Sequence, residues 1–324
     1  MKYSIIKSSD IRISKISFGC SNFGGIGSDP KLVGKGDSEA ASHEILNLAY
    51  NFGINHFDTA TTYAAGKSEE ILGTWIKKHK IPREKIIISS KVGSKVHSKF
   101  SFGKKGLSKK YLNKQVNQSL KRLQIDYLDL FYIHVPDPET PIIETLSTLN
   151  NLINEGKIRV IGASNIDLDY LQNSLKISRD NSLAEYKVVQ NSYSIINRSD
   201  EDSLIPFCKD NNILYVGYGP LAGGLLTGKY KKNTIYPQNS RLQLRSRLYE
   251  SILTDEVFDK IDLIKKIAKS MGTPLTTLTY SWLYNNKLID SFLIGSRNAS
   301  QFESVSQAID LYFTDDDYDH LCTM

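Results

Sequence analysis

Cysteine is scarce in this chain of 324 residues, which holds only Cys20, Cys208 and Cys322. The number is odd, the three positions lie far apart and no C-x-x-C pair occurs, so neither a disulfide framework nor a zinc ribbon fits. Histidine is scarce as well, and the six histidines show no H-x-x-x-H spacing. We therefore expect a protein of the reducing cytoplasm that carries no metal site.

Long apolar runs are also missing, since no stretch approaches the 18 residues of a spanning helix. Residues 1–12 turn polar after two isoleucines and lack the apolar core of a signal peptide. The net charge of +6 is too small and too dispersed to indicate nucleic acid. Basic residues gather at 95–110 and 229–247, which fits either solvated loops or the attraction of an anionic ligand. We expect neither a membrane nor a nucleic-acid partner.

The common nucleotide-binding loops are absent or incomplete. Gly223-x₄-Gly228-Lys229 matches most of a P-loop, but Tyr230 stands where the magnesium-binding Ser or Thr belongs. No G-x-G-x-x-G motif follows a predicted strand, which excludes a Rossmann nucleotide site.

The dominant pattern is a repeat of a short apolar run, a polar turn and an amphipathic stretch. The runs are apolar throughout, as is typical of parallel strands covered by helices. Eight of them predict an α/β fold, a (β/α)₈ TIM barrel formed by one domain over residues 1–324. The predicted strands are 16–18, 55–57, 86–90, 128–134, 160–163, 188–190, 214–217 and 292–294, and helices are predicted over 38–52, 68–79, 108–123, 141–155 and 168–178.

Additional segments complete this barrel. Residues 3–6 and 11–14 flank a turn and predict an N-terminal β-hairpin that plugs the barrel floor. The connections 92–107 and 220–255 exceed the usual loop length and leave the C-terminal ends of strands, where barrel active sites are built.

Polar side chains follow the second, third and fourth predicted strands, namely Asp58, Tyr63, Lys91 and His134. A charge at such a position points into the barrel mouth, where it needs a partner, and Asp58 with Lys91 is the natural pair. The Lys91 ammonium favours the phenolate form of Tyr63, so we expect a lowered tyrosine pKa. His134 can orient a substrate oxygen or relay a proton. None of the four is an electron sink, so a cofactor must supply any redox chemistry.

These four residues, in this order and spacing, resemble the catalytic tetrad of the aldo-keto reductases. The segments DTATTYAAGKSEEILG, LDLFYIHVPDPETPIIETL, GKIRVIGASNI, VVQNSYSIINR and YGPLAGGLLTGKY are similar to that family's motifs and follow the same order. The resemblance implies NADP(H) lying extended across the barrel mouth without a Rossmann fold. It also implies a small-molecule carbonyl substrate, an aldehyde or ketone with sugars and their derivatives included, and Tyr63 as general acid.

The resemblance further implies a set of cofactor-binding residues. Gly19 and Cys20 lie beneath the cofactor, and Asp58 is also among the contacts. Ser164, Asn165 and Gln190 hold the carboxamide, and Tyr218 stacks on the nicotinamide ring. The pyrophosphate is lined by Gly219, Pro220, Leu221 and Gly223, with Lys229 and Arg241 nearby, and the adenosine 2′-phosphate is held by Gly295, Ser296, Arg297 and Gln301. A guanidinium suits a phosphate, so Arg297 favours NADPH over NADH. The alternative interpretation of Arg297 is a solvent-facing arginine at the start of a helix.

The chain departs from the family pattern in places. Gly219 stands where many relatives have Ser, and Ser304-Val305 replaces a Glu-Asn pair that contacts adenine. The chain ends at Met324, soon after the last predicted helix, and so is similar to the short-tailed branch with sugar-type reductases and potassium-channel β subunits.

Two alternatives to a reductase stay open. One is a regulatory or redox-sensing protein of the channel-β type, which binds the cofactor; the complete tetrad favours the enzyme. The other is a barrel lyase or isomerase without a cofactor, which leaves residues 295–301 unexplained. The sequence identifies neither the substrate nor the oligomeric state.

Overall fold

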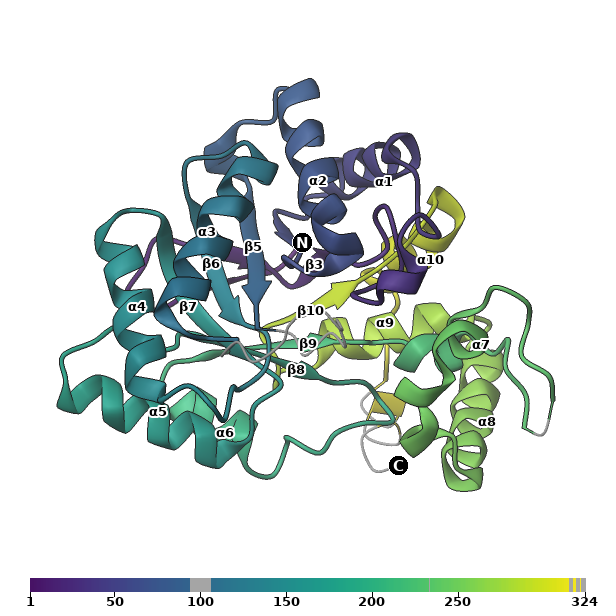
Figure 1. Cartoon of the computed structure of the whole chain (residues 1–324). Coiled ribbons are helices and arrows are strands. Elements are labelled where there is room, and N and C mark those ends of the chain that lie inside the picture. Colours follow the sequence, from purple (N-terminus) through teal and green to yellow (C-terminus); the bar gives the residue numbers. More distant parts are fainter. Residues whose placement is uncertain (94–105, 233, 315–316, 319–320, 322–324) are drawn as a thin grey trace.

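Eight parallel strands form a closed barrel in the order β10-β3-β4-β5-β6-β7-β8-β9, with helices around it (Figure 1). This computed structural model describes residues 1–93, 106–232, 234–314, 317–318 and 321. The barrel strands are β3 (Ile16–Gly19), β4 (His56–Asp58), β5 (Ile87–Val92), β6 (Leu128–Ile133), β7 (Ile158–Ser164), β8 (Val188–Ser192), β9 (Leu214–Tyr218) and β10 (Ser291–Ile294). The predicted (β/α)₈ barrel is confirmed, while its extent as one domain over residues 1–324 stays a prediction.

The helices are amphipathic and bury one face against the barrel. In α1, Ser38 caps the first turn by accepting the backbone N–H of Ala41 at 3.3 Å, and Ile45, Leu46 and Ala49 are buried. The helices are α1 (Glu39–Asn51), α2 (Lys67–Lys78), α3 (Lys109–Leu123), α4 (Ile142–Asn154), α5 (Leu168–Asp180), α6 (Leu204–Asp210), α7 (Arg241–Arg245), α8 (Asp255–Ser270), α9 (Leu275–Asn285) and α10 (Ala299–Ala308).

The N-terminal hairpin closes the floor of the barrel, as predicted. Its strands β1 (Tyr3–Ile5) and β2 (Arg12–Ser14) pair in an antiparallel manner. Ile6, Ile11 and Ile13 are buried against inward-facing strand side chains, among them Leu130, Val160, Val188 and Leu293. Burying one such side chain stabilises the fold by about 1.5–3 kcal/mol. Among the described residues the hairpin covers this end of the barrel, so a site is expected at the opposite end, where the strands terminate.

Strand alternation decides which residues reach the barrel interior. In β4, Phe57 points outward, with its ring centroid 5.0 Å from that of Trp75 on α2. Its neighbours His56 and Asp58 therefore point inward, and both are buried. In β5 the same alternation brings Ser89 and Lys91 inside.

The two long connections differ in what can be described. The connection after β9 contains a short 3₁₀ segment (Ala222–Thr227) and α7, and leads into α8 at one side of the barrel (Figure 1). Most of the connection after β5 lies outside the described residues, as does Cys322.

Candidate active site

A buried ion pair lies at the ends of β4 and β5. Lys91 Nζ donates to Asp58 Oδ1 and to the carbonyl of Thr59 at 3.0 Å, and each side chain of the pair is 1% exposed. Asp58 Oδ2 accepts two further hydrogen bonds, from Ser89 Oγ at 2.6 Å and from Gln190 Nε2 at 3.2 Å. The expected pair is present, and its carboxylate accepts hydrogen bonds from Lys91, Ser89 and Gln190.

Tyr63 lies beside this pair and keeps its proton. Lys91 Nζ is 5.2 Å from the centroid of the Tyr63 ring. Burial disfavours the charged form of Lys91. The interactions with Asp58 and then with Tyr63 outweigh this effect of burial, so the pKa of Lys91 is raised. Burial also raises the pKa of Tyr63, and the Lys91 ammonium offsets this only partly. The expected lowering of the Tyr63 pKa is therefore wrong. Burial removes water from the phenolate, and Lys91, which is already paired with Asp58, compensates for only part of that loss.

His134 follows β6 directly and contributes a neutral imidazole. Its ring meets that of Tyr63 edge-on, with centroids 5.8 Å apart. Burial, followed by the charge of Lys91, lowers the pKa of His134 to about 3. Within the described part of the chain its buried Nδ1 has no hydrogen-bond partner. The site therefore presents a protonated phenol beside an uncharged ring nitrogen that is open to a further partner.

Residues at the ends of β7, β8 and β9 are joined by hydrogen bonds. Asn165, with φ +56°, donates from Nδ2 to the His134 carbonyl at 2.8 Å and accepts the Tyr218 hydroxyl at 2.6 Å. Ser164 Oγ donates to the Gln190 carbonyl at 2.7 Å. The side chain of Gln190, expected at a carboxamide, is directed at Asp58. Asn165 therefore fixes Tyr218 relative to His134.

The end of β3 lies directly against Asp58. Cys20 donates its backbone N–H to the Asp58 carbonyl at 2.8 Å, and burial raises the pKa of its thiol. A Cβ on Gly19 would lie 3.3 Å from the Ile294 carbonyl, so the small residue suits the close approach to β10.

The connection after β9 presents a glycine-rich backbone formed by Gly219, Pro220, Leu221 and Gly223. Gly219 and Gly223 have φ of +71° and +70°. A Cβ on Gly223 would lie 2.4 Å from the Tyr249 ring, whereas one on Gly219 would meet open space. Such left-handed turns present backbone N–H groups that suit a phosphate.

Two cationic residues of the same connection are placed differently. Lys229 is exposed, and its Nζ lies 5.1 Å from the centroid of the Tyr230 ring. Arg241 donates to Asn22 Oδ1 at 2.7 Å. Asn22 in turn accepts the backbone N–H of Asp37 at 2.7 Å, so it links this connection to the segment before α1.

Residues Gly295, Ser296, Arg297 and Gln301 form the segment that follows β10. Arg297 Nε donates to Asp37 Oδ1 at 2.7 Å, and its backbone N–H donates to Gln301 Oε1 at 3.0 Å. The Arg297 side chain is 44% exposed, whereas that of Asp37 is 7% exposed. Among the described residues the second Asp37 oxygen and the buried Ser296 hydroxyl have no partner.

Asp37, the partner of Arg297, is a residue that sequence reasoning missed. Burial raises its pKa, and the hydrogen bond from Arg297 opposes that rise. It precedes Ser38, the cap of α1, and lies 260 positions from Arg297. No local pattern indicates such a contact.

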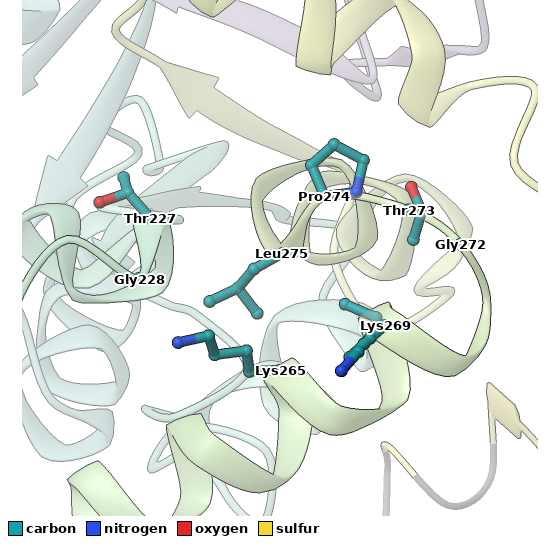
Figure 2. A pocket seen from close by; sticks show the side chains of 9 residues that line it. Thr227, Gly228, Lys265, Lys269, Gly272, Thr273, Pro274 and Leu275 are labelled. Carbon is teal, nitrogen blue, oxygen red and sulfur yellow. The ribbon is translucent and has the colours of Figure 1, made fainter.

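A separate surface pocket of about 570 Å³ lies between α8 and α9 (Figure 2). Lys265 and Lys269 extend toward it from α8, and Thr227 lies opposite. Its lining includes no carboxylate, imidazole or thiol.

Nowhere in the described chain do three His, Cys, Asp or Glu residues group as metal ligands would. None of the described helices has the length and apolar character needed to cross a membrane.

A buried Asp–Lys pair, Tyr63 and His134 thus lie together at the open end of the barrel. A sequence model described as "Aldo/keto reductase family" matches residues 15–323, and the chain belongs to this family. The family uses nicotinamide cofactors, and its reductases act on small carbonyl compounds.

Curated relatives cover nearly the whole chain. An "NADH-specific methylglyoxal reductase" from Escherichia coli (strain K12) is 33% identical over 328 residues, 98% of this chain and 96% of the relative. A "Probable voltage-gated potassium channel subunit beta" from Arabidopsis thaliana is 33% identical over 318 residues, 96% and 92% of the two chains. An "L-glyceraldehyde 3-phosphate reductase" from Escherichia coli (strain K12) is 31% identical over 322 residues, 95% and 88%.

Proposed function

We propose that this protein reduces an aldehyde or ketone to an alcohol with NADPH, and that Tyr63 is the general acid. The observation that carries the proposal is a tyrosine of raised pKa held beside the Lys91 ammonium and the neutral His134. A bound nicotinamide supplies the hydride. The protein must then deliver one proton to the carbonyl oxygen as negative charge develops there.

Each residue of the tetrad has one part in that proton delivery. Tyr63 donates its hydroxyl proton to the carbonyl oxygen. Lys91 stabilises the phenolate that remains, and Asp58 holds Lys91 in place. His134, with a pKa near 3, stays uncharged across the assay range and orients the oxygen by a hydrogen bond.

The proposed cofactor contacts are those that the family resemblance implies. The open space at Gly219 and the buried Ser296 hydroxyl, which has no partner among the described residues, are compatible with a bound dinucleotide. Arg297 is the proposed partner of the 2′-phosphate, although Asp37 already occupies its Nε. The NADH-specific relative makes this preference for NADPH the point most in need of a test.

Two relatives are named for small aldehydes, methylglyoxal and L-glyceraldehyde 3-phosphate, and we propose substrates of that size. A panel of 2-oxoaldehydes, hydroxyaldehydes, phosphorylated aldehydes and ketoses, each assayed by oxidation of NADPH and of NADH, tests the proposal. Turnover of at least one class with NADPH supports it. Absence of turnover with either cofactor, in a protein that still binds NADPH, contradicts it.

Binding of NADPH without turnover of any carbonyl would support a regulatory protein that binds the cofactor without rapid turnover. The similarity to the plant channel subunit is the observation that favours this alternative. Isothermal titration with NADPH beside the activity panel separates the two, because a sensor binds the cofactor but reduces none of the carbonyls.

A further inference from the structure

A chain of buried hydrogen bonds runs from Asp58 into the interior of the barrel. Ser89 Oγ lies 2.6 Å from Asp58 Oδ2 and 2.8 Å from His56 Nε2. His56 Nδ1 lies 2.8 Å from Ser17 Oγ, which lies 2.7 Å from Ser291 Oγ. All five residues are at most 1% exposed. The family tetrad uses Asp58 alone among them, so the other four polar groups need an explanation.

Strand geometry places these side chains in one line. His56 precedes Asp58 by two positions on β4, and Ser89 precedes Lys91 by two on β5, so each pair shares the inward face. The register pairs His56 with Ile87 and Asp58 with Ser89, which sets Ser89 beside both inward residues of β4. Ser17 and Ser291 come from β3 and β10, the next strands around the barrel.

The direction of each hydrogen bond follows from the chemistry of its ends. An ionised carboxylate only accepts, so the single hydroxyl hydrogen of Ser89 must point at Asp58. Ser89 Oγ then accepts from His56, which requires the tautomer protonated at Nε2. Burial lowers the pKa of His56 to about 4, so its Nδ1 is free to accept from Ser17. From His56 to Asp58 every donor therefore points toward the carboxylate.

The opposite direction is unfavourable. With His56 protonated at Nδ1, the Ser89 hydroxyl would have to turn toward Nε2. Two oxygens without a hydrogen between them would then face each other at the 2.6 Å that separates Ser89 and Asp58. At its far end the chain reaches the buried Ser14 carbonyl, 2.8 Å from Ser291 Oγ, rather than solvent. It cannot release a proton, so it orients groups instead.

We infer that His56 is a positioning residue whose Nε2–H tautomer fixes the Ser89 hydroxyl as a donor to Asp58. This orients the Asp58 carboxylate, which in turn holds Lys91 against Tyr63. The inference rests on the proposed function, because it is Tyr63 whose proton the arrangement serves. The titratable groups whose charges act on Asp58 from the surrounding elements are Cys20 after β3, Tyr63 after β4, Lys91 on β5, and Tyr132 and His134 on and after β6.

The variant His56→Phe keeps a ring but removes both nitrogens, and Ser89→Ala removes the hydroxyl. Ser89→Ala leaves the Asp58 carboxylate with one donor less, and His56→Phe leaves Ser89 without the group that fixes its orientation. In each variant Lys91 is therefore held less firmly against Tyr63. We expect kcat/KM to fall at least tenfold at neutral pH. The basic limb of its pH profile should move upward, because an ammonium that is held less firmly offsets the raised pKa of Tyr63 less. The double variant should behave like either single variant, because both interrupt the same chain of hydrogen bonds at Ser89.

Matched variants separate positioning from simple packing. His56→Gln carries an N–H that reaches the Nε2 position and should restore part of the activity, whereas His56→Asn reaches only the Nδ1 position and should not. His43→Phe removes another buried histidine, which bonds the Ile71 carbonyl on α2 at 3.1 Å, remote from the tetrad. It should lower the melting temperature without moving the pH profile. An unchanged profile in both His56→Phe and Ser89→Ala would overturn the inference.

One measurement on the parent protein is independent of turnover and of variant folding. Nitrogen-15 NMR of the imidazoles, without cofactor, should show His56 protonated at Nε2 and bare at Nδ1. The reverse tautomer would overturn the inference and leave the proposed function intact. Conversely, normal turnover by Tyr63→Phe would overturn the proposed function while the tautomer of His56 stayed as expected.

Discussion

Replacing Arg297 by Ala should weaken NADPH binding and leave NADH binding almost unchanged, since only NADP(H) carries the 2′-phosphate. A hydrogen bond to a charged group contributes about 1.5–3 kcal/mol, or roughly 10- to 200-fold in affinity. In this structure Arg297 Nε is already bonded to Asp37 at 2.7 Å and the side chain is 44% exposed. Only the terminal nitrogens remain for a phosphate, so we expect the lower end, about tenfold.

Asp37 provides the opposite perturbation at the same place. The Asp37 carboxylate and a phosphate bound to the same guanidinium would lie roughly 6 Å apart. The two groups repel each other by about 1–3 kcal/mol at an effective dielectric constant near 20, and by less where water screens the charges. Asp37→Asn should therefore tighten NADPH binding about fivefold. The two variants should shift the ratio of NADPH to NADH affinity in opposite directions.

Fluorescence-quenching titrations of both cofactors measure that ratio. Arg12→Ala, on the hairpin at the other end of the barrel, is the control for loss of one positive charge. Equal losses for both cofactors in Arg297→Ala, or no loss for either, would refute the reasoning and place the 2′-phosphate elsewhere or show that NADH is preferred.

Three further predictions follow from other parts of the structure. Lys91→Met should slow reduction and move the basic limb of the pH–rate profile upward, because the ammonium that opposes the raised pKa of Tyr63 is lost; an unmoved limb would exclude the pairing. The pKa of His56 is about 4 in the folded protein and near 6.5 in the unfolded chain. Protonation of His56 should therefore remove about 3 kcal/mol from the free energy of unfolding as the pH falls from 7 to below 4. Denaturant titrations that show no such loss would contradict this prediction. Gly223→Ala adds a Cβ 2.4 Å from Tyr249 at φ +70° and should lower the melting temperature more than Gly272→Ala, whose Cβ meets open space at φ +64°; equal effects would mean that Tyr249 moves aside.

The barrel could be predicted because its strands are short apolar runs with helical stretches between them. Strand ends could be located to within a residue or two, and the strand-end residues Asp58, Lys91 and His134 do meet at one end. The hairpin could be predicted as a plug because its isoleucines have no other surface to cover. These features depend on local sequence pattern alone.

Other features depend on distances that no local pattern contains. The contact of Asp37 with Arg297 requires two loops, 260 positions apart, to meet. Alternation indicates that His56 and Ser89 face inward, but only the register of β4 against β5 joins them. The raised pKa of Tyr63 depends on how much water the surrounding loops exclude, and that expectation was therefore wrong in sign.

The central claim, that Tyr63 gives its proton to a carbonyl oxygen, is tested most directly by single-turnover reduction with Tyr63→Phe. This variant removes one hydroxyl and keeps the ring that meets His134 edge-on. Loss of a general acid costs at least about 10²-fold in rate. The account predicts that loss in the reduction step, for the best aldehyde of the panel, with NADPH affinity close to that of the parent protein. A reduction rate within a few-fold of the parent protein would contradict it.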